Sequence, residues 1–220
     1  LSFHTMPEDS WLHGEPELLH HNYGLPDAFL ICCNQFWIQK NHLLLFEALA
    51  LLKAQGIIVP LVCTGSTADY RCQGYFDNLC MYLKQHEILN QVYILGSIPR
   101  ADQVQLIRRS MAVVQPSLFE GWSTVVEDAR ALGKIQILSD LDVHREQSPD
   151  YTTFFDRSDP KDLANTIGKL LPYLQPGPNL IRERSAAITA RRLVTKYART
   201  FCSIAREACE LYRNQGNMNS

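Results

Sequence analysis

The sequence lacks an excess of either charge, and it lacks a long hydrophobic run. It carries 21 Lys and Arg residues against 23 Asp and Glu residues, a formal net charge of -2 at pH 7. No broad positive surface is therefore predicted that would attract nucleic acid or an anionic membrane. The longest apolar run, Leu43 to Leu52, is interrupted by Glu47 and is far shorter than the roughly 20 residues that cross a bilayer.

Paired cysteine motifs and a leader segment are absent as well. The seven cysteines form no C-x-x-C and no Cys/His knuckle of the zinc-binding type, which indicates reduced thiols in a cytosolic protein. The first residues, LSFHTMPEDSW, have neither a basic start nor an apolar centre, so they are not a signal peptide. The chain opens on Leu1 instead of Met, which suggests a fragment.

The two commonest phosphate-binding motifs do not occur. CCNQFWIQKNH stands after the first apolar run, where an NAD-binding fold carries G-x-G-x-x-G, and there is no Gly-Lys-Ser/Thr of the Walker A type. A phosphate site in this chain must therefore depend on isolated cations and backbone amides.

What the sequence does contain is a regular alternation that begins at Ala28. Segments of helical period separate the short apolar runs AFLICC, IIVPLVCTG, QVYILG, AVVQPS, KIQILSD and TTFFD. Strands that are apolar throughout and separated by helices predict a parallel sheet covered on both faces. The fold class is therefore α/β, with a doubly wound, Rossmann-like sheet.

Three regions are predicted along the chain. Residues 1–27 are irregular and proline-containing, and we interpret them as a lead-in or linker with one short helix near EPELLHHNYG. Residues 28–179 form the α/β domain. Residues 180–220, after the break PYLQPGPN, form a long amphipathic helix and a tail.

Ligands of such sheets bind beyond the carboxyl ends of the strands, where loops lead into helix N-termini. This rule selects the loops that follow the predicted strands. They are 34–40, 65–67, 96–100, 116–124 and 139–146.

The loop after the fourth strand continues into FEGWSTVVEDARALG. Gly121 lets a ligand approach the backbone, and Ser123 or Thr124 can cap the following helix, whose free N–H groups favour a phosphate. Glu120 stands at the lip of this loop. Asp128, about one turn inside the helix, can accept hydrogen bonds from paired hydroxyls such as those of a ribose. An ordinary helix N-terminus with acidic early turns is the other interpretation.

Four segments resemble one family in the same order and with the same spacing. PSLFEGWSTVVEDARALG with the following ILSDLDVHREQ resembles the donor-site region of retaining glycosyltransferases of family 4, a large GT-B group with the motif Glu, seven residues, Glu. NQFWIQKNHLLLFEAL, LGSIPRADQVQLIRRS and FFDRSDPKDLANTI resemble further segments of it, so the resemblance covers residues 28–175. It implies the C-terminal, donor-binding half of a GT-B fold.

The resemblance also implies a role for each residue of the donor site. Lys40 would meet the diphosphate, Glu120 the sugar hydroxyls and Asp128, not the adjacent Glu127, the ribose. Glu120 and Lys40 are the implied catalytic residues. The remaining substrate contacts are the residues after the first acid and those flanking the base: Gly121, Trp122, Ser123, Thr124, Gly96 and Ile98.

The chain departs from the family pattern at two of these positions. Gln35 stands where many members have Arg, so one of two expected phosphate cations is missing. The second acid, Asp128, is one methylene shorter than the usual Glu, which shortens its reach.

Three further features, one segment and two single side chains, have two interpretations each. Asp140-Leu-Asp142 spells the D-x-D of metal-dependent glycosyltransferases, but it follows a late strand and is also typical of a solvent-facing loop. His144 either serves the site or is structural. Trp122 either stacks on a sugar or packs against a neighbouring loop.

The function implied by the resemblance is hexosyl transfer, often mannosyl or glucosyl, from a nucleotide diphosphate sugar to a growing cell-surface polysaccharide. It would retain stereochemistry and use no metal or other cofactor. The implied partners are the nucleotide sugar and an N-terminal acceptor-binding domain. Residues 1–27 are too short to supply that domain. Any peripheral association with a membrane would be through that domain alone. A cytoplasmic location is expected.

Two other functions stay open on the residues alone. A donor-binding half could bind a nucleotide sugar without catalysing transfer. An unrelated flavodoxin-like regulator is the third hypothesis. It would need acidic residues at the end of the first strand, where CCNQFW has none.

Overall fold

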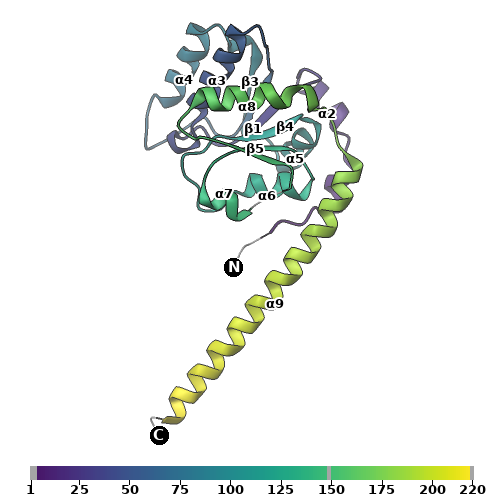
Figure 1. Cartoon of the computed structure of the whole chain (residues 1–220), viewed down its shortest axis with the longest axis vertical. Coiled ribbons are helices and arrows are strands. Elements are labelled where there is room, and N and C mark those ends of the chain that lie inside the picture. The colour runs from purple at the N-terminus through teal and green to yellow at the C-terminus, as the bar shows by residue number, and fades with distance from the viewer. Residues whose placement is uncertain (1–3, 148–149, 219–220) are drawn as a thin grey trace.

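The computed structural model describes residues 4–147 and 150–218. Its centre is a parallel sheet of six strands in the order β3-β2-β1-β4-β5-β6 (Figure 1). The predicted doubly wound α/β fold is confirmed. The strands are β1 (Leu30–Cys33), β2 (Leu61–Thr64), β3 (Val92–Gly96), β4 (Ala112–Gln115), β5 (Gln136–Ser139) and β6 (Thr152–Phe155).

Helices cover both faces of this sheet. One face carries α3 (His42–Ala54), α4 (Tyr75–Gln85) and α8 (Pro160–Leu170), and the other carries α5 (Arg100–Arg109) and α6 (Thr124–Ala131). The short helix α7 (Asp142–Gln147) follows β5, and three 3-10 turns complete the connections: η1 (Ile38–Lys40), η2 (Leu89–Gln91) and η3 (Leu171–Tyr173).

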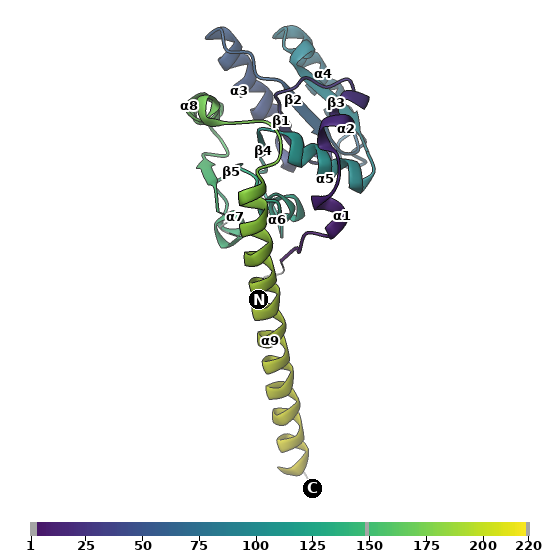
Figure 2. The same cartoon turned by 90° about the vertical axis from the view of Figure 1, so that its right-hand side faces the viewer.

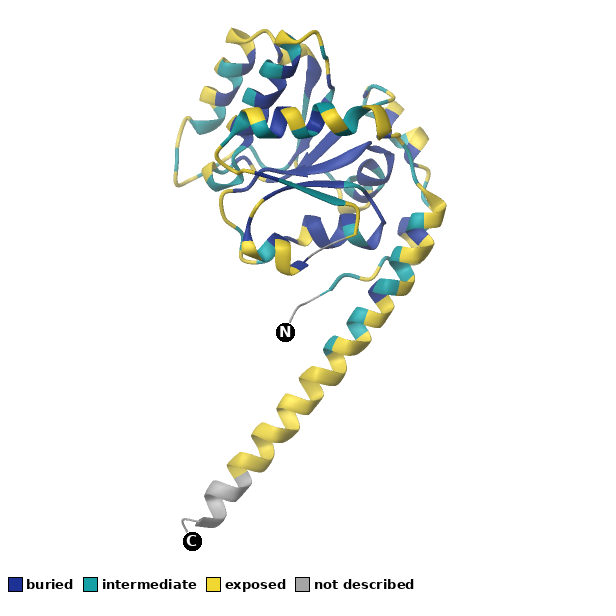
Figure 3. Ribbon diagram, viewed as in Figure 1, coloured by how far each residue is buried: buried dark blue, intermediate teal, exposed yellow. Residues whose placement is uncertain are grey.

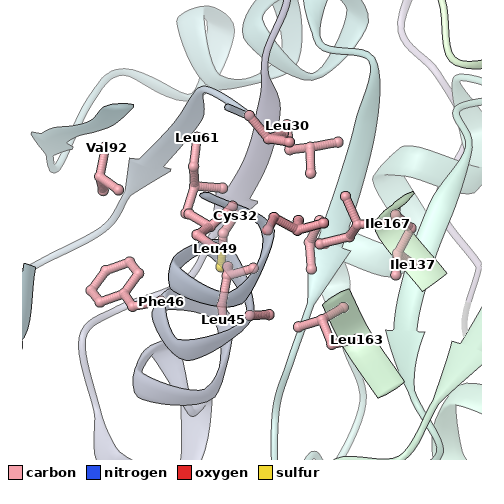
Figure 4. Packing of buried hydrophobic residues seen from close by; sticks show 14 of the residues in the cluster. Leu30, Cys32, Leu45, Phe46, Leu49, Leu61, Val92, Ile137, Leu163 and Ile167 are labelled. Carbon is pink, nitrogen blue, oxygen red and sulfur yellow. The ribbon is translucent and has the colours of Figure 1, made fainter. Parts of the chain in front are cut away.

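The two hydrophobic cores explain why the strands are apolar at every position. In β1, Leu30 and Cys32 pack in the core under α3 and α8, where Leu49 and Ile167 also lie (Figure 4). Ile31 and Cys33, the alternate residues, pack in the core under α5 and α6. Successive side chains of a strand point to opposite faces, so a strand covered on both sides has no polar face.

The segment before the first strand packs against α5. The sequence predicts one short helix there, which the structure places at α2 (Pro16–Asn22), and the pattern missed a second one, α1 (Asp9–Leu12). Trp11 is buried, and its carbonyl accepts a hydrogen bond of 2.9 Å from Gln105 Nε2. Figure 2 shows α1 and α2 beside α5.

The predicted C-terminal helix is also confirmed. Helix α9 (Leu180–Met218, 39 residues) contacts α6 near its start and then runs away from the sheet (Figure 1). Its first turns are held by Glu183, which accepts a hydrogen bond of 2.8 Å from Arg108 Nε. The side chains of residues 198–212 are all exposed (Figure 3). No helix in the described part of the chain is both long and apolar enough to span a bilayer.

The strand order fixes where a ligand can bind. β1 lies between β2 and β4, so the chain turns to one side after β1 and to the other side after β4. The loops after these two strands therefore diverge and leave a crevice at the carboxyl edge of the sheet, which is the usual ligand position in doubly wound folds.

Candidate functional site

A cavity of about 350 Å³ lies at this point of the sheet, and its size is in the range of small-molecule sites. Residues from the loops after β1, β2, β3 and β4 line it. Six of the predicted site residues are among them: Lys40, Ile98, Glu120, Trp122, Ser123 and Thr124. Gly96, Gly121 and Asp128 are not among the lining residues.

Lys40 and Glu120 meet at the cavity although 80 positions separate them in sequence. The Nζ atom of Lys40 lies 2.6 Å from Oε1 of Glu120. Lys40 ends η1 after β1, and Glu120 lies in the loop after β4. A backbone hydrogen bond of 2.8 Å from Leu118 N to Gln39 O joins these two loops. The structure thus brings together the cation and the first acid that the sequence singled out.

Three donors converge on the same carboxylate oxygen of Glu120. Besides Lys40, Ser117 donates from Oγ at 2.7 Å and Gln115 donates from Nε2 at 2.9 Å. Gln115 also forms a reciprocal amide pair with Asn34, with both distances 3.0 Å. Sequence reasoning missed Gln115, and it selected Asn34 only as the first residue of the loop 34–40. The available signal was the polar Gln within the otherwise apolar strand run AVVQPS.

The N-terminus of α6 forms one wall of the cavity. Ser123 caps the helix, because its Oγ accepts a hydrogen bond of 3.4 Å from Val126 N. This confirms the predicted cap and starts α6 at Thr124, where the helix dipole favours a negative charge. A Cβ placed on Gly121 would meet no atom within 4 Å, so the backbone before the cap is open to an approaching group.

The two adjacent acids of α6 point to different partners. Asp128 accepts two hydrogen bonds of 2.6 Å from Arg100, in a bidentate pair whose carboxylate is 2% exposed and whose guanidinium is 49% exposed. Glu127 is buried against Arg130 and also accepts a hydrogen bond of 3.0 Å from Gln147 Nε2. A rotation of about 100° per residue separates them. The ribose contact of Asp128 stays a prediction.

Within the Arg100–Asp128 pair, burial has its largest effect on the carboxylate of Asp128. Burial raises the pKa of Asp128 above its usual value, although the hydrogen bonds from Arg100 oppose that shift. The hydrogen bonds to Asp128 raise the pKa of Arg100. The carboxylate therefore depends on this one guanidinium for its charged form.

Trp122 and His144 have different surroundings. Trp122 is half-buried at the cavity wall, and its buried Nε1 atom has no hydrogen-bond partner among the described residues. His144 does not line the cavity: its Nδ1 lies 2.8 Å from Ser139 O, and burial lowers its pKa. Ser139 Oγ in turn donates to Ser117 O at 2.7 Å. His144 thus supports the loop that carries Glu120 from behind.

Metal-ligating side chains come together at one described place outside the cavity. His20, His21 and Asp27 have ligand atoms within 4.8 Å of one another. Arg109 donates from Nε to His20 Nδ1 at 3.2 Å and lies 3.6 Å from Asp27, so a cation there would face a guanidinium. In the D-x-D segment, the hydrogen bond from Arg145 lowers the pKa of Asp140, whose carboxylate is already paired.

These features define a class of protein. A parallel sheet whose order reverses between β1 and β4, with a cation, a carboxylate and a helix N-terminus around a cavity at that point, is a Rossmann-like α/β domain. A sequence profile described as glycosyl transferases group 1 matches residues 20–173, which is more than half of the chain. The chain belongs to this family.

Solved structures share the fold at low sequence identity. The Anabaena protein Alr3699/HepE in complex with UDP is 19% identical with a TM-score of 0.68, over 89% of this chain and 54% of that chain. A glycosyltransferase from Rickettsia africae is 17% identical with a TM-score of 0.71, over 86% of this chain and 51% of that chain. The chain thus spans about half the length of these two proteins.

A third structure is matched over nearly its whole length. The catalytic domain of cholesterol-alpha-glucosyltransferase from Helicobacter pylori is 19% identical with a TM-score of 0.57, over 75% of this chain and 98% of that chain. No curated protein sequence matches the chain. The structural matches show the Rossmann-like architecture seen in GT-B glycosyltransferases.

Proposed function

We propose that this chain is the donor-binding part of a retaining glycosyltransferase that moves a hexosyl group, such as glucosyl or mannosyl, from a nucleotide diphosphate sugar to a cell-surface polysaccharide. The observation that carries the proposal is the contact of 2.6 Å between Lys40 and Glu120 at the cavity wall, beside the N-terminus of α6. Cation, acid and helix end are the parts that a sugar diphosphate needs.

Each part has a separate task in this proposal. Lys40 and the first turn of α6 stabilise the negative charge that grows on the departing diphosphate, and this charge is larger in the transition state than in the ground state. Glu120 accepts hydrogen bonds from sugar hydroxyls. The acceptor attacks on the face from which the diphosphate leaves, a phosphate oxygen assists its deprotonation, and the configuration is retained. No metal is required in this scheme.

Asp128 is proposed to accept from the ribose hydroxyls. A carboxylate has about four lone-pair sites, and Arg100 occupies two of them. The pair as a unit would then lie at the nucleoside end of the donor. The seven free cysteines support a cytoplasmic site of action as part of this proposal.

The deciding experiment is a thermal-shift and calorimetry panel of UDP, GDP and ADP with their glucose and mannose conjugates. UDP and UDP-glucose are tested first, because Anabaena Alr3699/HepE was solved with each of them. At 100 times its dissociation constant, a ligand stabilises the fold by about 2.7 kcal/mol. Uridine without phosphate is the matched control. If no nucleoside diphosphate stabilises the chain, the donor site is absent.

We also propose a second function, a module that binds a nucleotide sugar without catalysing its transfer. The contact of Lys40 with Glu120 beside the N-terminus of α6 supports donor binding by itself. Binding of a sugar nucleotide with no transfer to any of a panel of sugar acceptors is the outcome expected for a non-catalytic module. Transfer by this 220-residue chain would exclude it.

A further inference from the structure

A buried amide pair joins the ends of β1 and β4 directly beneath the cavity. Asn34 follows β1, Gln115 is the last residue of β4, and both are buried. Each side-chain amide donates to the oxygen of the other at 3.0 Å. These strands are neighbours in the sheet, so the pair closes the floor of the crevice between the two diverging loops.

The amide nitrogen of Gln115 has more acceptors in reach than protons to give. The two nearest are Glu120 Oε1 at 2.9 Å and Asn34 Oδ1 at 3.0 Å, and they account for its two N–H groups. The oxygens of Ser123 and Ser117 follow at 3.3 and 3.5 Å. A single amide therefore connects the loop after β1 with the proposed sugar-binding acid and lies against the cap of α6.

We propose that Gln115 is a positioning residue, which together with Asn34 fixes the carboxylate of Glu120 relative to the capped N-terminus of α6. This inference rests on the proposed donor site. Three donors hold Glu120, and they differ in what a bound diphosphate does to them. Lys40 is a cation on a flexible stem and is drawn toward phosphate. Gln115 is neutral and buried, so it keeps its hold on Glu120 when Lys40 turns to the ligand.

Burial alone does not account for this arrangement. Gln136, in the neighbouring strand β5, is equally buried, and neither of its side-chain amide atoms has a partner among the described residues. The sheet thus tolerates a buried glutamine without a hydrogen-bond network. Gln136 also provides a matched control, because it has the same residue type and burial but does not line the cavity.

The test compares Gln115→Met with Gln136→Met in calorimetric titrations of UDP and UDP-glucose. Gln115→Met is expected to weaken UDP-glucose about tenfold, the loss of one hydrogen bond to a charged group, and to change UDP less than about twofold. Gln136→Met is expected to change neither. An equal loss for both ligands, or the same loss in both variants, would overturn the positioning role.

A second measurement needs no ligand. Amide hydrogen exchange over residues 116–126 is expected to be faster in Gln115→Met than in the parent and unchanged in Gln136→Met. If the parent bound none of the nucleotides, the proposed function would be wrong. The exchange data would still test whether Gln115 positions the loop that carries Glu120. Unchanged exchange in Gln115→Met would refute it.

A milder variant covers the case in which Gln115→Met does not fold. Asn34→Ser removes the partner of Gln115 but leaves the contact between Gln115 and Glu120 possible. It is expected to weaken UDP-glucose by about threefold, a fraction of a full hydrogen bond, with UDP again spared. Parent-like affinity for both nucleotides in Asn34→Ser would remove Asn34 from the proposal.

Discussion

Arg100→Gln is expected to destabilise the chain more than Asp128→Asn, although both substitutions break the same bidentate pair. The two partners differ in exposure: the carboxylate is 2% exposed and the guanidinium 49%. In Arg100→Gln the carboxylate loses two donors at 2.6 Å and stays buried. In Asp128→Asn the guanidinium can turn to water. The exposure of the partner that remains therefore decides how much folding free energy is lost.

The exposures set the magnitudes. A buried charge that loses its partner costs about 3 to 5 kcal/mol, which is the expected loss for Arg100→Gln at neutral pH. A half-exposed guanidinium recovers its hydration, so Asp128→Asn should cost about 1 to 2 kcal/mol, toward the lower end of the roughly 1.5 to 3 kcal/mol that hydrogen bonds to charged groups contribute. The double variant should cost less than the sum, because two contacting residues share one interaction.

The pH dependence has a definite sign. Burial raises the pKa of Asp128 above 3.8, and the hydrogen bonds from Arg100 oppose this. Removing Arg100 raises that pKa further, and a carboxyl group with a raised folded pKa loses stability as pH rises from its unfolded pKa through its folded one. The deficit of Arg100→Gln relative to the parent should thus be smaller at pH 4 than at pH 7.

Urea unfolding at both pH values, followed by tryptophan fluorescence, measures these differences. Equal losses in the two single variants, or a larger loss in Asp128→Asn, would refute the reasoning from exposure. Calorimetry with UDP on the same proteins tests the ribose assignment. If Asp128→Asn binds UDP and UDP-glucose like the parent, the carboxylate serves the fold and not the ligand.

Four further outcomes are expected. Lys40→Ala should weaken UDP by about 1 to 3 kcal/mol in calorimetry, the value of a charge-assisted phosphate contact, and equal losses for UDP and uridine would place Lys40 outside the phosphate site. Glu120→Gln should weaken the binding of UDP-glucose but not that of UDP. Glu127→Gln should lower stability without changing the ratio of the two affinities. The reverse pattern would contradict the assignment of Glu120 as the sugar-binding acid. EDTA should leave sugar-nucleotide binding unchanged, and a loss reversed by manganese or magnesium would revive the D-x-D segment as a metal site. Burial lowers the pKa of His42 to about 3, so the unfolded chain takes up a proton first as pH falls below 6.5 and stability declines. His42→Phe should remove about 2 kcal/mol of that decline between pH 7 and 5 in urea titrations. If the free energy of unfolding fell with pH as steeply as in the parent, His42 would not be the group responsible.

The sheet and the loops at its carboxyl edge could be predicted from apolar runs that alternate with helical segments. Within those loops, Lys40 and Glu120 were selected by the resemblance of their segments to the glycosyltransferase family, and their direct contact was not predicted. Residues after β1 and β4 become neighbours because these strands pair in parallel. A separation of 80 positions was therefore no obstacle, since the order of the strands brings the two loops together.

The partners of individual side chains could not be obtained in this way. The pairs Asn34–Gln115 and Arg100–Asp128 depend on which rotamers face each other across strands and helices, and no local pattern encodes that. Helix α1 was missed because four residues are too few to display a helical period. Its place is fixed by the burial of Trp11 and by the contact with α5, which are tertiary effects.

Helix α9 also affects how unfolding of this chain should be measured. The side chains of residues 198–212 are exposed, so this part of the helix is stabilised by its own backbone hydrogen bonds and local propensity, which are marginal for an isolated helix. It should open as a separate cooperative unit at lower temperature than the sheet. All three tryptophans, Trp11, Trp37 and Trp122, lie before α9. Fluorescence therefore reports the sheet domain alone, whereas far-ultraviolet circular dichroism adds the earlier melting of α9, and a single two-state fit to the dichroism would understate the stability of the domain.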